Sequence, residues 1–241
     1  MYTSVEPVGF VLARDWENSR HSEYSAVMAQ YFRVHAVTPQ RRLMRGAADI
    51  IRRGGVIAYP TDSSYALGCH LGDKDAMERI RRLRGLDQNH HFTLICRDLS
   101  ELSLYARVDN PSYRFLKAHT PGPYTFILPA TREVPRRLQH AKRRTVGLRI
   151  PAHPVTQTLL AELGEPLLSV SLLLPSASGD PIAANDPTEI RQHLEHEVDL
   201  VLDGGYCGGD QTTVIEFDGH GAHVVRFGKG SISPFVGSQT A

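Results

Sequence analysis

A fifteen-residue stretch, GGVIAYPTDSSYALG at residues 54–68, constrains the fold more than any other part of this chain. Its apolar run at residues 56–59 favours a buried strand, and Pro60 ends the ladder because proline has no amide proton. Five oxygen-bearing side chains follow directly, from Thr61 to Tyr65. Ligands of open α/β sheets bind outside the carboxyl ends of strands, so we expect a substrate site here. The structural alternative is an Asp/Ser turn whose side chains satisfy only their own backbone.

The rest of the chain alternates between strand-like and helix-like segments. We expect Thr38 to cap the first helix and Asn110 to cap a later one. The alternation predicts an α/β fold with a mixed, twisted sheet flanked by helices and a hairpin at residues 212–227. The expected strands cover residues 31–37, 56–59, 92–96, 124–127, 146–150, 166–175 and 198–202, and the expected helices cover 39–53, 73–84, 99–106, 111–119 and 154–163, with another from 187.

Length and composition indicate a soluble globular protein. The chain has 241 residues, of which 41% are hydrophobic, and this is enough for a real core. No apolar run approaches the roughly 20 residues that cross a bilayer, so we expect a cytoplasmic protein without a membrane partner. The three cysteines, Cys69, Cys96 and Cys207, are odd in number and lack CxxC spacing. They are expected to be small buried thiols rather than a disulfide framework or a zinc site.

The net charge of +1 hides a strong division along the chain. Residues 1–149 hold 24 Lys and Arg against 14 Asp and Glu, whereas residues 150–241 hold 3 against 12. A basic half suggests partners that carry phosphate, such as RNA or a nucleotide. The alternative is that the two halves neutralise each other across an internal or dimer interface.

Two basic segments, at residues 79–84 and 134–144, are the candidate RNA contacts. Contact with backbone phosphates would be independent of sequence and sensitive to salt. A solvated helix face is the alternative for the first segment. The residues expected to contact tRNA, rRNA or double-stranded RNA are Arg79, Arg82, Arg136, Arg137, Lys142, Arg143 and Arg144.

Other patterns narrow the kind of site. His90 and His91 are adjacent on a predicted strand and would face opposite ways, so we predict no metal site from this pair. The chain has no P-loop and no GxGxxG motif, so a nucleotide site would be neither Walker nor Rossmann type. Ser169 and Ser171 would point to one face of a buried strand, where hydroxyl groups need partners. A ligand and the protein backbone are both plausible partners.

Five segments in this order carry a family resemblance, namely YPTDSSYALG (59–68), PGPYTFIL (121–128), VGLRIPAHP (146–154), PLLSVS (166–171) and TTVIEF (212–217). Together they resemble the YrdC-like domain family, and the segments between them look closest to its YciO branch. The resemblance begins near Met28, so we expect a single YrdC-like domain at residues 28–236 with a positively charged concave surface. Residues 1–27 would be a disordered or upstream-start extension, and residues 237–241 a tail.

The resemblance implies a nucleotidyltransferase linked to tRNA threonylcarbamoyladenosine modification. In synthases of this family, threonine and bicarbonate form a carbamate whose oxygen attacks the α-phosphate of ATP, giving threonylcarbamoyl-AMP and pyrophosphate. ATP and Mg²⁺ would therefore be required. The resemblance assigns catalysis to Arg84 and Arg149. It assigns substrate or nucleotide binding to Thr61, Asp62, Tyr65, His90, Thr125, His153, Ser169, Ser171 and Arg226.

Two positions depart from the pattern of the synthases. Leu86 replaces the second cation of a KxR motif, and Leu173 replaces the asparagine of SxSAN. Each loss would cost on the order of 2 to 4 kcal/mol of transition-state stabilisation if the geometry is shared. We therefore expect either a weak or altered synthase or an RNA-binding protein without synthase activity. A structural homodimer is a third hypothesis.

Overall fold

The structure is a computed structural model that describes residues 28–88, 90–176, 180–218 and 221–233. The extension at residues 1–27 and the tail at residues 237–241 lie outside the described residues, as does the expected domain end at residue 236. Those boundaries therefore stay predictions. No helix within the described part of the chain is long and apolar enough to cross a membrane.

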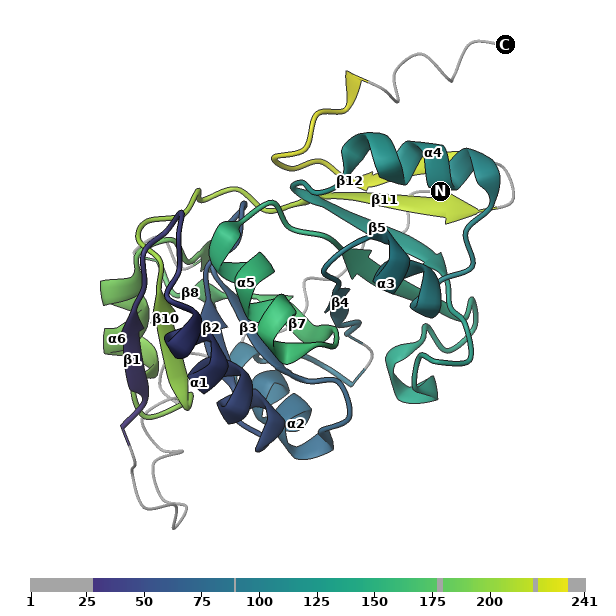
Figure 1. Ribbon diagram of the computed structural model, residues 1–241. Coiled ribbons are helices and arrows are strands. Elements are labelled where there is room, and N and C mark those ends of the chain that lie inside the picture. Colours follow the sequence, from purple (N-terminus) through teal and green to yellow (C-terminus); the bar gives the residue numbers. More distant parts are fainter. Residues whose placement is uncertain (1–27, 89, 177–179, 219–220, 234–241) are drawn as a thin grey trace.

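Ten strands form one mixed sheet, which runs the length of the molecule (Figure 1). The strands are β1 (Gln30–Arg33), β2 (Ile57–Tyr59), β3 (Ala66–His70), β4 (Thr93–Ile95), β5 (Tyr124–Pro129), β6 (Thr145–Arg149), β7 (Leu167–Ser171), β10 (Leu200–Asp203), β11 (Thr213–Asp218) and β12 (Gly221–Arg226). Their order is β1-β10-β2-β3-β7-β4-β6-β5-β11-β12, with parallel pairs at β1–β10, β10–β2, β4–β6 and β5–β11. Two short strands, β8 (Leu173–Leu174) and β9 (Ile182–Ala183), pair separately. The predicted α/β fold with a mixed sheet is confirmed.

Six α-helices and one 3₁₀ turn flank the sheet in the described residues. They are α1 (Arg41–Arg52), α2 (Lys74–Arg84), α3 (Leu99–Tyr105), α4 (Asn110–His119), η1 (Arg136–Leu138), α5 (Pro154–Leu163) and α6 (Pro187–Leu194). Helices α1 and α5 lie side by side over one face, where Met44 and Leu159 pack with Ile57 and Leu202 (Figure 1). Helices α2, α3, α4 and α6 contribute to a second core, which includes Ala58 on the other face of β2.

The second core leaves one face of the remaining strands open. Along β5, Phe126 and Leu128 are fully buried, and Phe126 meets Phe115 of α4 at a ring distance of 6.4 Å. Thr125 and Ile127 alternate with them and are only half-buried. Because successive side chains of a strand point to opposite faces, these two residues face away from α4. The sheet therefore has an apolar side under the helices and a more polar side that is open.

Two predicted helix caps are wrong. Gln40, not Thr38, precedes the first helical residue, and the Thr38 hydroxyl instead lies 2.9 Å from His35 Nδ1. Asp109, not Asn110, caps α4, because its carboxylate accepts a hydrogen bond from the Ser112 amide at 2.9 Å. An aspartate beside an asparagine is an equally good cap, so the sequence alone favours neither.

The prediction that the three cysteines are buried is confirmed. Cys69, Cys96 and Cys207 are all buried free thiols. Burial raises the pKa of the Cys69 thiol to about 12 and that of Cys207 to about 11. Both groups are therefore neutral thiols at physiological pH.

Candidate active site

A cavity of about 370 Å³ lies on the open face of the sheet. Strands β4, β5, β6, β7, β11 and β12 supply its floor, and the loops after β2 and α2 supply part of its wall. No aspartate or glutamate is among the described residues that line it. Eight of the residues predicted for catalysis or for substrate or nucleotide binding do line it, namely Tyr65, Arg84, His90, Thr125, Arg149, Ser169, Ser171 and Arg226.

Strand register places the cavity-lining residues of the strands in rows across the floor. In one row, Ile95 pairs with Arg149. Because Phe126 pairs with Leu148 in the antiparallel direction, the row continues from Arg149 to Thr125. Thr125 pairs with Val214, and Val214 pairs with Arg226. The next row contains Thr93 and Gly147. A side chain at position 147 would approach the Thr93 hydroxyl to 3.3 Å, so glycine keeps the middle of the floor clear.

Arg149 lies at one end of the cavity and is only 6% exposed. Its Nη2 donates to the Asp62 carboxylate, to Thr61 Oγ1 at 3.2 Å and to Ser63 Oγ at 3.0 Å. The second oxygen of Asp62 accepts a hydrogen bond from the Ala152 amide at 2.9 Å. A buried cation needs such a partner, and Asp62 joins the loop after β2 to the end of β6.

The loop after β2 also satisfies its own backbone. Thr61 Oγ1 donates to the Ser64 carbonyl at 2.6 Å and accepts hydrogen bonds from the amides of Ser63 and Ser64. Thr61 therefore satisfies its own backbone, as in the turn considered from the sequence, whereas the Asp62 side chain leaves the loop and accepts a hydrogen bond from Arg149. Thr61 and Asp62 lie behind the cavity wall and act on it through the guanidinium group.

Arg84 and Arg226 lack the kind of partner that Arg149 has. Arg84 Nε donates to the Ser171 carbonyl at 2.7 Å. Arg226 donates to the Thr212 carbonyl at 3.1 Å and to its hydroxyl at 3.2 Å. Neither forms an ion pair with the described residues. Burial lowers the pKa of both groups, yet an arginine stays protonated, so two partly desolvated cations face an acid-free cavity.

The two serines of β7 differ in how firmly protein contacts hold their hydroxyl groups. Ser169 Oγ donates to the Leu67 carbonyl at 2.8 Å and lies 2.7 Å from the Tyr59 hydroxyl. Burial raises the pKa of Tyr59 to about 12. Ser171, two residues further along β7, is half-buried and faces the same cavity. The hydroxyl group of Ser169 is therefore satisfied by protein atoms, including a backbone carbonyl, whereas the hydroxyl group of Ser171 is the more available of the two for a ligand.

Two more predicted residues shape the wall. Tyr65 is buried, donates to the Gly205 carbonyl at 2.9 Å and accepts from the Gly204 amide at 3.3 Å. Thr125 Oγ1 lies 2.9 Å from Thr212 Oγ1, which also contacts Arg226. These contacts hold the wall and the β11–β12 edge in place.

His153 lies outside the residues that line the cavity. It precedes α5, and its buried Nδ1 has no hydrogen-bond partner among the described residues. Burial lowers the pKa of this imidazole, while the Asp62 charge opposes that shift. His153 therefore belongs to the Asp62–Arg149 end of the site.

The seven predicted RNA contacts fall into two groups. Arg79 donates to Asp199 Oδ2 at 2.6 Å and to the Glu197 carbonyl, and Arg137 donates to the Gly72 carbonyl at 3.0 Å. Arg143 pairs with Glu216. These three are engaged within the fold, and their contact with RNA stays a prediction. The other four are exposed and form no ion pair with the described residues, namely Arg82, Arg136, Lys142 and Arg144.

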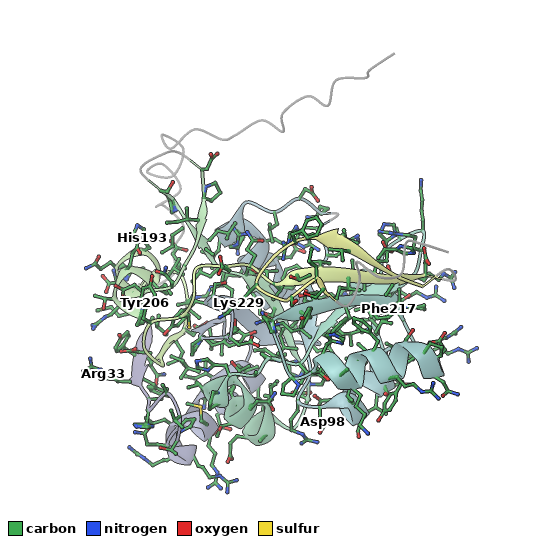
Figure 2. The ribbon with its side chains drawn as sticks, turned by 90° about the horizontal axis from the view of Figure 1, so that it is seen from above. Arg33, Asp98, His193, Tyr206, Phe217 and Lys229 are labelled. Atoms are coloured by element: carbon green, nitrogen blue, oxygen red, sulfur yellow. The ribbon has the colours of Figure 1, made fainter. Side chains whose placement is uncertain are left out.

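Sequence reasoning missed several residues of the site. Lys229 (Figure 2) follows β12, and its Nζ donates to the Asp62 carbonyl at 2.6 Å. His91 and His140 also line the cavity. The alternation of Thr145, Gly147 and Arg149 on β6 was a signal for the open face, because each second residue there is small or polar.

The two departures from the synthase pattern lie in different surroundings. Leu86 packs against the second core, and its amide donates to the Arg81 carbonyl at 2.9 Å. Leu173 lines the cavity. The described residues contain no group of three or more His, Cys, Asp or Glu that could hold a metal ion.

Comparisons with known proteins show the family and the fold of this chain. Residues 49–228 match the Sua5/YciO/YrdC family model, described as "Telomere recombination". The uncharacterized protein YciO of Escherichia coli is 54% identical over 209 residues, which is 87% of this chain and 100% of that protein. Its crystal structure has a TM-score of 0.82 and covers 86% of this chain and 100% of that one.

Relatives with a named activity or ligand are more distant. The threonylcarbamoyl-AMP synthase of Nitrosococcus oceani is 38% identical over 162 residues, which is 67% of this chain and 85% of that enzyme. The structure of P. abyssi Sua5 complexed with L-threonine is 25% identical, with a TM-score of 0.73 over 82% of this chain and 57% of that one. By its family-model match, its relatives and its fold, this chain belongs to the Sua5/YciO/YrdC family.

Proposed function

We propose that this chain is a nucleotidyltransferase that forms threonylcarbamoyl-AMP from threonine, bicarbonate and ATP, in support of tRNA modification in the cytoplasm. One observation carries the proposal. Arg84 and Arg226, two partly desolvated guanidinium groups without a carboxylate partner among the described residues, face an acid-free cavity of about 370 Å³. Such an arrangement suits a polyanionic ligand.

The chemistry divides between the two ends of the cavity. Bicarbonate carbamoylates the threonine amine with loss of water, and the carbamate oxygen then attacks the α-phosphorus of ATP while the bond to the β-phosphate breaks. Arg149 binds the amino-acid carboxylate through the Nη1 that its protein contacts leave available. Arg84 and Arg226 bind phosphate and stabilise the charge that moves onto the leaving pyrophosphate. Bound magnesium would screen the same charge.

Leu173 makes the proposed activity weak. It lines the cavity in the place of an amide and cannot donate a hydrogen bond. Leu86 is anchored in the core and supplies no second cation beside Arg84. We therefore expect slower turnover than a relative with both polar groups, with the same products.

Pyrophosphate release tests the proposal. Purified protein with ATP, Mg²⁺, bicarbonate and threonine should release pyrophosphate only when threonine is present. Arg226→Ala should abolish this release, because it removes a cation that faces the cavity. Arg82→Ala removes an exposed arginine of α2 with no ion-pair partner in the described chain, and it should leave release unchanged. Release without threonine, or equal loss in both variants, would contradict the proposal.

RNA binding is a second candidate function, favoured by a specific observation. Arg136, Lys142 and Arg144 are exposed and form no ion pair with the described residues, and the last two flank Arg143, which lines the cavity. Contact with RNA phosphates would make the affinity for double-stranded RNA fall steeply with salt, with a logarithmic slope of about −2 to −4 for a few contacts. The triple Arg136→Ser, Lys142→Ser, Arg144→Ser variant should flatten that slope. An unchanged slope would remove this candidate.

A further inference from the structure

The part of the cavity lined by the cluster of His91, His140 and Arg143, which we call its mouth, is not used by the proposed function. The rings of His91 and His140 lie 4.9 Å apart, and both residues line the cavity together with Arg143. Strand register explains why they meet. Thr93 of β4 pairs in parallel with Gly147 of β6, and the His140 amide donates to the carbonyl of Thr145 at the start of β6, so the segment before β4 and the loop before β6 lie side by side. Thr145, which follows this loop, begins β6, and Arg149 ends the same strand about 13 Å away, four residues at about 3.3 Å each.

The loop that carries His140 is tightly closed. The His140 amide donates to the Thr145 carbonyl at 2.8 Å, and the Arg144 amide donates to the His140 carbonyl at 2.8 Å. Arg144 adopts a positive φ of 52°, a left-handed conformation that non-glycine residues rarely adopt. Arg143, inside this loop, is held by its ion pair with Glu216. These hydrogen bonds and the ion pair therefore hold the backbone of the loop that carries His140 and Arg143 in place.

The same loop fixes the tautomer of His140. Nδ1 of His140 accepts hydrogen bonds from the Arg143 amide at 3.1 Å and the Lys142 amide at 3.3 Å. A nitrogen that accepts carries no proton, so the neutral ring carries its proton on Nε2. That N–H is a donor that no described residue accepts, on a residue that lines the cavity.

Charges around the cluster are mixed but mainly positive. Burial lowers the pKa of His91, and His140, Arg143 and Arg81 of α2 lower it further, whereas Asp87 opposes them. Glu216 of β11 partly neutralises Arg143. Lys142 and Arg144 are exposed beside it without ion-pair partners in the described residues. An anion at the mouth would therefore find both hydrogen-bond donors and positive charge.

We infer that His91, His140 and Arg143, which no step of the proposed reaction uses, form a phosphate-binding subsite at the mouth of the cavity. The phosphate is either the outer end of a bound polyphosphate or a backbone phosphate of RNA. For the first source, this inference rests on the proposed function in that a nucleotide occupies the cavity.

His140→Asn isolates the proposed donor. The asparagine Oδ1 can accept the amides of Lys142 and Arg143 as Nδ1 does, so the loop stays closed, but the Nε2–H is lost. Calorimetric titration with inorganic pyrophosphate should show about tenfold weaker binding, the usual effect of losing a hydrogen bond to a charged group. Glu216→Gln should strengthen binding severalfold because it frees Arg143. His196→Ala alters an exposed histidine near α6 and should change nothing.

Titration with a short double-stranded RNA, followed by fluorescence anisotropy, distinguishes the two sources. Weaker pyrophosphate binding by His140→Asn assigns the subsite to polyphosphate, and weaker RNA binding alone assigns it to RNA. The inference is wrong if His140→Asn binds both probes as the wild type does, or if the wild type binds neither. Because pyrophosphate binding needs no turnover, this result stands even if threonine-dependent release is absent.

Discussion

Arg149 and Arg226 lie on the same row of the sheet but differ in what balances their charge. Arg149 is 6% exposed and has the Asp62 carboxylate as a partner within the fold. Arg226, on the edge strand β12, is held by the carbonyl and hydroxyl of Thr212. Arg84 resembles Arg226, since its bond is to a carbonyl as well. At the Arg149 end, called the completed end, the fold itself supplies a carboxylate partner and Nη1 is left for the substrate carboxylate. Arg84 and Arg226 have no carboxylate partner in the described residues, so the ligand would supply their anion.

The largest effect on this difference is expected when the Asp62 carboxylate, the partner of Arg149, is removed. Asp62→Ala would leave the guanidinium of Arg149 buried and unpaired, and should lower the free energy of unfolding by about 3 to 5 kcal/mol. Urea denaturation measures this loss. Asp210→Ala removes an exposed aspartate from a loop and serves as the matched control. A loss below about 1 kcal/mol for Asp62→Ala would show that the ion pair does not hold this end together.

The floor between the two ends should be the next most sensitive region. Ser169→Ala removes the partner of the buried Tyr59 hydroxyl and should cost about 1 to 3 kcal/mol of unfolding free energy. Ser171→Ala, on the half-buried neighbour, should cost less than about 0.5 kcal/mol but reduce ligand affinity. The two variants are compared by urea denaturation. Equal losses of stability would contradict the distinction between a fixed and an available hydroxyl.

A polar side chain at position 173 of the cavity wall tests what the ligand contacts contribute to the activity. Leu173→Asn returns an amide to the cavity wall and should raise threonine-dependent pyrophosphate release by about tenfold, equivalent to about 1.4 kcal/mol. Leu174→Asn changes the adjacent buried leucine, which does not line the cavity, and should destabilise the protein without increasing release. Unchanged release by the first variant would exclude Leu173 as the reason for weak activity.

The smallest expected effect concerns pH and the completed end. Burial lowers the pKa of His153 below its ordinary value of 6.5, so the unfolded chain binds more protons than the folded one below that pH. Stability should therefore fall as the pH decreases from about 6.5 towards the folded pKa. His153→Asn should reduce that slope, as measured by thermal unfolding between pH 7.5 and 5. A slope identical to the wild type would show that His153 does not titrate in this range.

Local patterns predicted most of the fold and part of the site. The strand–polar loop–strand pattern of residues 54–68 located the Asp62 loop, and the resemblance placed Arg149 beside it. What the sequence could not show was which cations already have partners. Arg79 is bound by Asp199, which is 120 residues away, and this pairing exists only after β10 joins the sheet. The contact of His91 with His140 likewise depends on the parallel pairing of β4 with β6.

A calorimetric titration of ATP with Mg²⁺ tests the central claim most directly, using the wild type and the Arg84→Ala, Arg226→Ala double variant. The account predicts that the wild type binds ATP, that the double variant loses at least about 100-fold in affinity as two charge-assisted contacts disappear, and that both unfold at similar urea concentrations. Equal ATP affinity in the two proteins, or no binding by the wild type, would contradict the claim that these arginines await a nucleotide.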